Sequence, residues 1–407
     1  MLNPIRAAIL ISKMKINQWK SREELEELQQ RRLDKLLKYA SEEVPGYGGY
    51  AGKLLADLPV IGKMEISSGR ESYIGRRFNR EKLTMIKTSG STGRPTETYY
   101  DSADGLYASV LRYHQLTECG FGPMDSMSEI MYSKEPKNIL QKMGIYRINH
   151  ATPVEPVDEV YNHLLRRRPD FVLAYPSTMA IASIINNRNA KKVRLRGVFC
   201  QSEVLHQSTR EAIMDSFGAY VRNSYSSNET RNIAWECEEG SMHINSDSII
   251  VEVLDDENQP VRGGKSGHLV VTPLWRYSMP FIRYRIGDTG SLGGKCRCGR
   301  GTHILKSIDG RDNDIVIGPS GEGVSPARIE LAIGLNKEII QYQVRQEERG
   351  KITVLAISSK KVEPKELAAK IEKKLDGMSV DVEIVDSIPR TKNGKVKCVF
   401  STLKLGD

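Results

Sequence analysis

Hydrophobic positions recur with a helical period near the start of the chain. They form one apolar stripe made of Leu25, Leu28, Leu33, Leu36, Leu37 and Ala40. Ser21 is a suitable N-cap, and Glu23 and Glu24 suit the positive end of a helix. The pattern therefore predicts a helix from Ser21 to Val44 that docks on the body of the protein and ends before Pro45.

Downstream of this helix, short apolar runs of β character alternate with helical patterns. Phe171–Ala174 precedes a helical pattern at Ser177–Asn187, and Gly197–Cys200 precedes another at Ser208–Phe217. This alternation is typical of βαβ units and a parallel sheet. Ligands of such sheets bind beyond the carboxyl ends of the strands. We expect Leu83–Ile86 to be a strand, and the loop that follows it to lie at such an end.

The pattern changes again past residue 240. Ile249–Leu254 and His268–Thr272 are typical of short strands on either side of the turn-rich Asp255–Lys265, which indicates an antiparallel, barrel-like subdomain over 240–310. Helices and strands are both expected from residue 311 onward, at Ser325–Leu335, Pro364–Leu375, Ile352–Ile357 and Val380–Val385.

A chain of 407 residues with 39% hydrophobic content is too long for one ordinary core. We expect an α/β fold with a large N-terminal domain, residues 1–310, that has parallel-type sheets, helices and the β-rich subdomain. A small, mobile α+β domain should follow at residues 311–407, with its hinge at Gly310–Asp314.

Charged residues make up 27% of the chain, and the formal net charge is +9. The basic clusters Arg166–Arg168 and Lys191–Arg196 suit anionic substrates, although solvated surface is the more common role of such runs. Ala7–Ile11 is too short to span a bilayer, and neither a cleavage pattern nor a nucleic-acid motif is present. We expect a cytoplasmic protein with small-molecule substrates, no nucleic-acid or membrane partner, and a homodimer left open.

The stretch Thr88–Pro95 reads Thr-Ser-Gly-Ser-Thr-Gly-Arg-Pro. Glycines let such a loop turn, and its backbone N–H groups and hydroxyls can wrap a polyphosphate. It lacks the Lys-Ser/Thr pair of a Walker A loop, and a flexible Ser/Gly linker has a similar composition. The residues that would contact phosphates are Thr88, Ser89, Gly90, Ser91, Thr92 and Gly93.

Four later segments favour phosphate binding by this loop. They read Tyr-x-x-x-Glu, Tyr-Arg-x-Gly-Asp, Gly-Arg-x-x-Asp and Asn-Gly-Lys, and lie at Tyr225–Glu229, Tyr284–Asp288, Gly310–Asp314 and Arg390–Lys395. This order resembles the adenylate-forming superfamily of acyl-CoA synthetases, peptide adenylation domains and luciferases. Within the superfamily, the chain looks most like the phenylacetate–coenzyme A ligase branch and that branch's capsule-cluster and deazaflavin-adenylylating relatives. The positions that carry this likeness are Thr96, Ala174–Thr178 and Gln201–Glu203.

The resemblance implies an ATP site with a role for each motif. The loop would hold the β- and γ-phosphates, Glu229 would bind Mg²⁺, and Asp288 would accept hydrogen bonds from the ribose. Arg311 would help to hold the ribose or phosphates, and Lys395 would reach the α-phosphate region. The residues that would border the adenine, with the tyrosine stacking on it, are Ser202, Glu203, Ser224 and Tyr225.

The sequence departs from the family pattern at three places. Asn313 stands at the hinge position, where Asp or Lys is usual, and Ser226 replaces the usual glycine of the Tyr-Gly-x-x-Glu motif. Ser126–Lys137 lacks the glycines of the loop that follows the phosphate loop in phenylacetate–coenzyme A ligases. The two-step domain alternation and the identity of the acid therefore stay open.

Six cysteines in a long chain that we expect to be cytoplasmic do not suggest a disulfide framework. Cys296 and Cys298 share a Gly-rich turn, and Cys237 and His243 flank another turn. Three sulfurs and one imidazole make a tetrahedral structural zinc set, with His303 as an alternative fourth ligand. Reduced turn cysteines and an unrelated buried pair remain the other interpretation.

Together these features predict an AMP-forming ligase. It would activate an aryl or acyl carboxylic acid with ATP and Mg²⁺, release pyrophosphate, and transfer the acyl group of the adenylate to coenzyme A. One alternative keeps the activation but uses an amine or a hydroxyl as the acceptor. The other is a non-catalytic nucleotide-binding relative.

Overall fold

The computed structural model describes residues 4–87, 96–132, 139–311, 314–334 and 336–403. The chain forms two compact units that interleave in sequence, residues 1–120 with 224–308 and residues 121–223 with 309–407. The expected domain division at residue 310 stays a prediction. The predicted phosphate loop and Asn313 lie outside the described residues.

The first unit begins with helices α1 (Pro4–Asn17), α2 (Arg22–Glu43), α3 (Lys63–Ser68) and α4 (Ser102–Glu118). The predicted helix after Ser21 is confirmed as α2, and its N-terminus is a capping box. The Ser21 side chain accepts from the Glu24 N–H, and the Glu24 carboxylate accepts from the Ser21 N–H. Leucines of the predicted stripe are buried against the β-strands of this unit.

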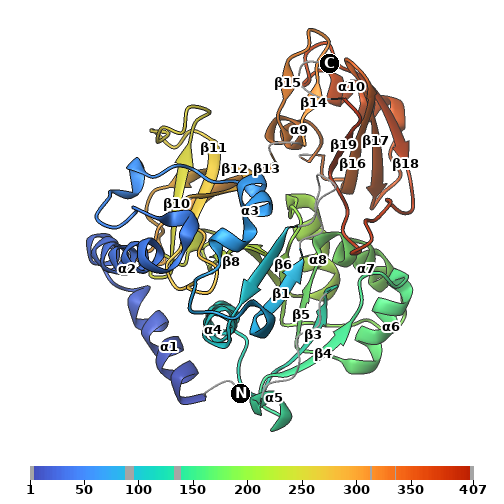
Figure 1. Ribbon diagram of the computed structural model, residues 1–407. Helices are drawn as coiled ribbons and strands as arrows, with labels where there is room; N and C mark the ends of the chain where they lie inside the picture. The colour runs from blue at the N-terminus through green and yellow to red at the C-terminus, as the bar shows by residue number, and fades with distance from the viewer. Residues whose placement is uncertain (1–3, 88–95, 133–138, 312–313, 335, 404–407) are drawn as a thin grey trace. The chain divides into compact units, whose positions relative to one another are not determined.

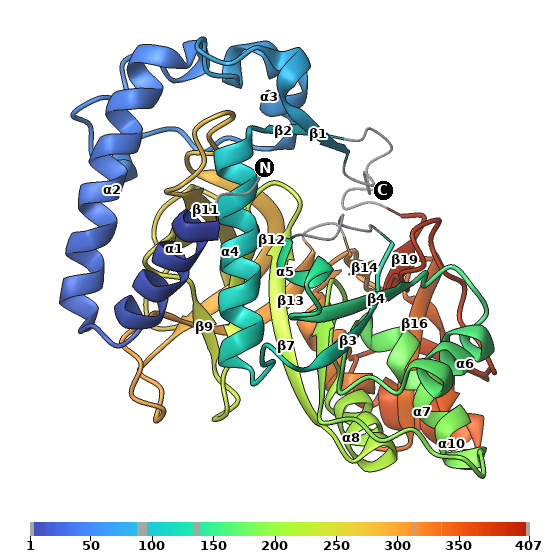
Figure 2. The ribbon, with the colours of Figure 1, turned by 90° about the horizontal axis from the view of Figure 1, so that it is seen from below.

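Two further features complete the helical part of the first unit. Figure 2 shows α1 beside α4, where Met14 packs with Leu106, Val110 and Leu111. Short 3₁₀ turns connect the elements, at Pro45–Tyr47, Leu55–Asp57, Arg70–Tyr73 and Arg80–Lys82. Among the helices of the described residues, none has both the length and the apolar character that crossing a membrane requires.

Strands β1 (Thr84–Lys87) and β2 (Glu97–Tyr100) pair with each other antiparallel as a separate two-stranded sheet. The strand expected at Leu83–Ile86 is confirmed, but its place at the end of a parallel sheet is wrong. Because β2 follows closely, its edge satisfies the hydrogen bonds of β1 locally. Strand β1 therefore belongs to an antiparallel pair and not to the parallel sheet.

The β-rich part of the first unit has the strand order β10-β11-β12-β13-β9-β8-β7. Its strands are β7 (Tyr220–Ser227), β8 (Arg231–Glu236), β9 (Met242–Ile244), β10 (Ile249–Leu254), β11 (Gly267–Pro273), β12 (Tyr284–Gly293) and β13 (Ile304–Arg311). Strand β11 pairs antiparallel with both β10 and β12, and β8 pairs antiparallel with β7 and β9. The antiparallel character expected for residues 240–310 is confirmed.

The second unit contains the parallel strands that the sequence predicts (Figure 1). Strand β3 pairs parallel with β4 and β5, and β5 pairs parallel with β6. The elements are β3 (Ser126–Ile130), α5 (Ile139–Lys142), β4 (Arg147–Ala151), α6 (Val157–Arg167), β5 (Phe171–Ala174), α7 (Pro176–Arg188), β6 (Gly197–Gln201) and α8 (Gln207–Phe217). Helices α6, α7 and α8 bury their apolar faces against these strands. The βαβ expectation is thereby confirmed.

The rest of the second unit is a small α+β assembly with the strand order β18-β17-β16-β19. Its elements are β14 (Val316–Ile317), β15 (Gly323–Val324), α9 (Pro326–Ile333), β16 (Ile339–Glu348), β17 (Lys351–Ser358), α10 (Pro364–Glu372), β18 (Ser379–Ile384) and β19 (Val399–Ser401). Both helices pack on the sheet in one apolar core. Ile357 and Val396 belong to a second cluster that Ile181 and Ile184 of α7 contact.

Candidate active site and metal centre

Glu229, the predicted Mg²⁺ ligand, lies in the turn between β7 and β8. Strand β7 runs on to Ser227, immediately before this turn. Glu229 is only 9% exposed, yet no described residue forms a hydrogen bond or ion pair with its carboxylate. A secluded carboxylate without a donor is suited to a hard cation.

Tyr225 and Asp288 come from two of the predicted motifs, and the structure brings them together. The Tyr225 hydroxyl donates to the Asp288 carboxylate at 2.6 Å. Tyr225 and its neighbour Ser224 are both buried near the end of β7, while Asp288 is half-buried in the middle of β12. The ribose and adenine roles of these residues remain predictions.

Ser202 and Glu203 follow the parallel strand β6 in the second unit. Ser202 has a φ of 71°, a left-handed conformation that costs free energy in a residue other than glycine. The Glu203 carboxylate accepts from the Ser177 N–H at 3.0 Å, the Ser177 hydroxyl at 3.1 Å and the Val396 N–H at 2.6 Å. Burial raises the pKa of the Glu203 carboxyl, and these hydrogen bonds oppose that shift.

Lys395 directly precedes Val396, whose N–H donates to the Glu203 carboxylate. Its own N–H donates to the Thr391 hydroxyl at 3.2 Å, in the turn that Asn393-Gly394 makes. Its Nζ lies 5.6 Å from the ring centroid of Tyr175, the residue that precedes α7. The structure thus joins the Asn-Gly-Lys motif to the Ala174–Thr178 and Gln201–Glu203 motifs. Arg311, by contrast, is exposed at the end of β13.

The predicted metal ligands Cys237, His243, Cys296 and Cys298 converge in the first unit. One ligand atom from each lies within 4.8 Å of all the others. Cys237 follows β8, His243 is on β9, and both other cysteines follow β12. The cysteines are free thiols.

The separations within this cluster suit a tetrahedral metal site. The Cys237 and Cys296 sulfurs are 3.7 Å apart, and the Cys298 sulfur is 3.3 Å from His243 Nε2. Two sulfurs bound to one zinc ion would be about 3.8 Å apart. The alternative ligand His303 is not in the cluster, because its ring contacts Ser246 and Glu26.

His243 is prepared to act as a neutral ligand. It is completely buried, and its Nδ1 lies 2.7 Å from the Thr302 hydroxyl, which orients the ring and leaves Nε2 toward the sulfurs. Burial lowers the pKa of His243 to about 4, and the nearby Arg300 charge adds to this shift. Burial also raises the pKa of the Cys237 thiol to about 12, an effect that a bound cation would oppose.

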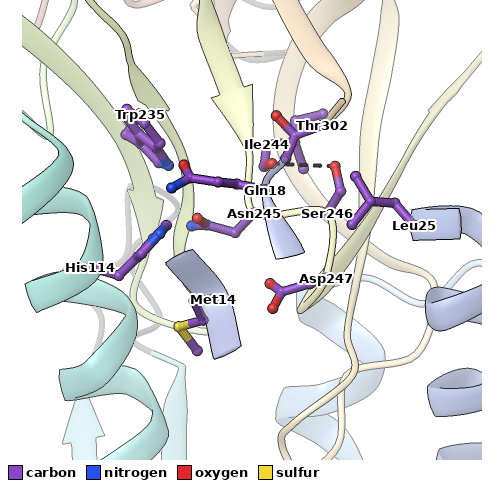
Figure 3. A pocket seen from close by; sticks show the side chains of 10 residues that line it. All are labelled: Met14, Gln18, Leu25, His114, Trp235, Ile244, Asn245, Ser246, Asp247 and Thr302. Atoms are coloured by element: carbon purple, nitrogen blue, oxygen red, sulfur yellow. Dashed lines mark hydrogen bonds between the residues drawn. The ribbon is translucent and has the colours of Figure 1, made fainter. Parts of the chain in front are cut away.

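Thr302 also lines a cavity next to this cluster, with His114 and Trp235 on the other side (Figure 3). The cavity volume is about 10 Å³, which is room for about one water molecule. Neither ring nitrogen of His114 has a hydrogen-bond partner among the described residues, and burial lowers the pKa of this histidine. The cavity is too small for a nucleotide or an acid substrate.

Sequence reasoning missed Arg276 and Tyr100, which hold the turn that carries Glu229. The Arg276 guanidinium donates to the Glu229 carbonyl oxygen, and the Tyr100 hydroxyl donates to the carbonyl of Asn228. Neither residue belongs to a recognisable motif. The only sequence signal is the place of Tyr99-Tyr100 shortly after the predicted phosphate loop.

Comparisons with known proteins agree with the motifs. The family model described as the CapK C-terminal domain matches residues 316–402. Phenylacetate-coenzyme A ligase of Escherichia coli is 28% identical over 429 residues, covering 93% of this chain and 95% of that protein. The enzyme of the same name from Thermus thermophilus is 28% identical over 357 residues, covering 79% and 78%. Protein CapK of Staphylococcus aureus is 23% identical over 413 residues, covering 94% and 90%.

The fold is shared with solved ligase structures. A structure of 2-hydroxyisobutyryl-CoA ligase in complex with R3-HIB-AMP matches with a TM-score of 0.77 at 20% identity, covering 95% of this chain and 91% of that one. The order of motifs, the shared fold and the similar proteins point in one direction. The chain has the fold of these ligases, and its sequence is similar to phenylacetate-coenzyme A ligases and to protein CapK.

Proposed function

We propose that the protein is an AMP-forming ligase that joins a carboxylic acid to coenzyme A at the expense of ATP. The observation that carries this proposal is the arrangement of Tyr225, Glu229 and Asp288 in one unit. Tyr225 and Asp288 share a hydrogen bond, and Glu229 lies in the turn that follows β7, the strand that carries Tyr225. The phenylacetate-coenzyme A ligases among the similar proteins support the same reaction class.

The proposed reaction has two steps. A carboxylate oxygen attacks the α-phosphorus of ATP, and pyrophosphate leaves to give an acyl-adenylate. The thiol sulfur of coenzyme A then attacks the acyl carbon, and AMP leaves with the bonding electrons of the cleaved acyl–oxygen bond. Lys395 would stabilise the charge that develops near the α-phosphorus, an interaction that is stronger in the transition state than in the ground state.

Glu229 is the proposed Mg²⁺ ligand. Its buried carboxylate has no donor among the described residues, and carboxylate oxygens with phosphates are the ligands that Mg²⁺ prefers. When bound, the ion would neutralise part of the phosphate charge. Glu229 itself would fix the place of that charge relative to the nucleotide bound beside Tyr225 and Asp288.

The four-residue cluster of Cys237, His243, Cys296 and Cys298 is the proposed structural zinc site. Three thiolates and one imidazole would complete a tetrahedron and leave no open position for a substrate. Its ligands come from the ends of β8 and β12 and from β9. Zinc would therefore stabilise the loops that follow β8 and β12. Strand β8 begins just after the Glu229 turn, and strand β12 contains Asp288.

The proposal is tested by pyrophosphate release from ATP and Mg²⁺ with a panel of aryl, fatty and amino acids, each with and without coenzyme A. Release with one acid class, together with a thioester identified by mass spectrometry, is the expected result. Release without a thioester would move the proposal to an amine or hydroxyl acceptor. Absence of release, together with unimpaired ATP binding, would favour a non-catalytic nucleotide-binding protein.

A further inference from the structure

Arg276 is a completely buried arginine in the loop after β11. Its Nη1 donates to the Tyr100 hydroxyl oxygen at 2.9 Å and to the Glu229 carbonyl, and its Nη2 donates to the Tyr99 carbonyl at 3.1 Å. The guanidinium also lies over the rings of Tyr100 and Phe281, at 3.9 Å and 4.5 Å from their centroids. One side chain thus connects several separate segments of the first unit.

The burial of this charge is energetically expensive. Among the described residues, no carboxylate lies within ion-pair distance of Arg276, and its Nε has no hydrogen-bond partner. Burial raises the pKa of the Asp104 carboxyl, and the nearby Arg276 charge opposes this shift. The Asp104 oxygens, however, accept hydrogen bonds from Tyr277 and Ser278. A buried charge that no carboxylate pairs with is a cost to folding, so stability alone does not explain it.

The acceptors of Arg276 show what the guanidinium aligns. Tyr99 and Tyr100 end β2, the strand that follows the predicted phosphate loop. The Glu229 carbonyl belongs to the turn that presents the predicted Mg²⁺ ligand, and Tyr100 donates to the preceding carbonyl, that of Asn228. Two successive carbonyls of the turn are therefore held, one by the arginine and one by the tyrosine that the arginine contacts.

We propose that Arg276 is a positioning residue that keeps the Glu229 turn in register with the strand that follows the phosphate loop. This inference rests on the proposed function, in which Glu229 and that loop share one Mg²⁺–ATP complex. Arg276 acts through the peptide of Glu229 and through Tyr100, and it does not touch the reacting atoms. Its planar guanidinium presents donors in a fixed fork to oxygens on two segments, whereas a lysine ammonium is a compact charge with rotatable donors on a flexible stem.

The test compares Arg276→Lys with a matched arginine elsewhere in the unit. Arg32 of α2 has the same kinds of partner, a phenol oxygen at Tyr107 and a backbone carbonyl at Asp247, so Arg32→Lys is the control. In pyrophosphate-release assays, Arg276→Lys should raise the Mg²⁺ concentration for half-saturation about tenfold, the effect of losing about 1.4 kcal/mol of binding. Saturating Mg²⁺ should restore most of kcat, and the KM for the acid should not change.

A milder variant guards against misfolding. Tyr100→Phe keeps the ring beneath Arg276 but removes the hydroxyl that donates to the Asn228 carbonyl, so it should raise the Mg²⁺ requirement in the same direction by a smaller factor. A purely structural role predicts a loss of thermal stability in the Arg276 variant with no change in the Mg²⁺ requirement of either variant. That result would overturn the inference.

Metal binding without turnover separates this inference from the proposed function. Mn²⁺ titrated in the presence of ATP and followed by electron paramagnetic resonance reports the same site in an inactive enzyme. Weaker Mn²⁺ binding by Arg276→Lys than by Arg32→Lys would support the positioning role even if no acid is turned over. If both arginine variants bound Mn²⁺ equally well and Glu229→Gln bound it weakly, the positioning role alone would be overturned. If the wild type bound no Mn²⁺ in the presence of ATP, both the positioning role and the proposed function would be overturned.

Discussion

The Tyr225 hydroxyl and the Asp288 carboxylate form a hydrogen bond of 2.6 Å across 63 residues of sequence. Their strands, β7 and β12, are separated in the sheet order by β8, β9 and β13. Four steps between neighbouring strands of a flat sheet would place them about 19 Å apart. The strands of this unit must therefore curl strongly, as expected for a barrel-like subdomain, and the curl brings two motifs into one site.

We expect Tyr225→Phe to raise the KM for ATP about tenfold and to change kcat little. The variant keeps the ring but loses a hydrogen bond to a charged group, a contribution of about 1.5–3 kcal/mol that helps to orient Asp288. The measurement is pyrophosphate release as a function of ATP concentration. Tyr107→Phe is the control, because its hydroxyl contacts Ser248 at 2.9 Å in the same unit. An ATP requirement equal in both variants would contradict the assigned role.

Lys395→Ala is expected to lower the rate of adenylate formation by about 100-fold or more, because a charge that acts in the transition state is lost. ATP binding, measured by calorimetry, should stay within about threefold of the wild type. Lys392 is exposed in the same turn, so Lys392→Ala controls for the loss of one positive charge. If both variants retained full pyrophosphate release, Lys395 would have no catalytic role.

The purified protein is expected to contain about one zinc ion per chain, which elemental analysis measures. Cys237→Ser or Cys298→Ser should lose the metal and lower the melting temperature by several degrees, because a structural metal contributes to folding. Cys398→Ser is the matched control, since Cys398 lies outside the cluster and should leave the zinc content unchanged. Metal-free wild-type protein with an unchanged melting temperature would be incompatible with a structural zinc.

His206 predicts a pH dependence of stability in the second unit. It is buried with its Nδ1 2.5 Å from the Glu330 carboxylate, and Cys398 lies 4.0 Å from its Nε2. Burial alone would lower the pKa of His206, but the neighbouring Cys398 thiol and Glu330 carboxylate outweigh it and raise this pKa from 6.5 to about 10. The folded protein therefore binds a proton that the unfolded chain releases near pH 6.5.

The stabilisation from this proton is complete below pH 6.5 and is lost as the pH rises toward 10. Between those values the wild type should lose unfolding free energy on the order of 5 kcal/mol, measured by urea denaturation. His206→Gln should be less stable at pH 6 and should show a flatter profile over the same range. The Tyr342 hydroxyl, which donates to the same Glu330 oxygen at 2.6 Å, stays protonated in this range because burial raises its pKa well above 10. Parallel profiles for both proteins would exclude His206 as the titrating group.

The sequence by itself determined the local elements and the chemical types at the site. The capped helix after Ser21 and the strand Phe171–Ala174 follow from spacing within a few residues, and the structure has both. The cysteines and histidine of the metal cluster were identified by type and by the turns around them. Each of these signals lies inside a short window, where backbone propensity and side-chain period act directly.

Only the tertiary structure decided which distant residues meet. Strand β1, expected in the parallel sheet, pairs antiparallel with β2 instead, and the curl of the larger sheet joins Tyr225 to Asp288. Arg276 could not be recognised at all, because nothing local distinguishes a buried arginine from a surface one. Its role depends on acceptors from Tyr99, Tyr100 and Glu229, which are neighbours in space and not in sequence. Strand order and sheet curvature arise from packing over the whole unit, and these long-range contacts are what place the predicted residues in one site.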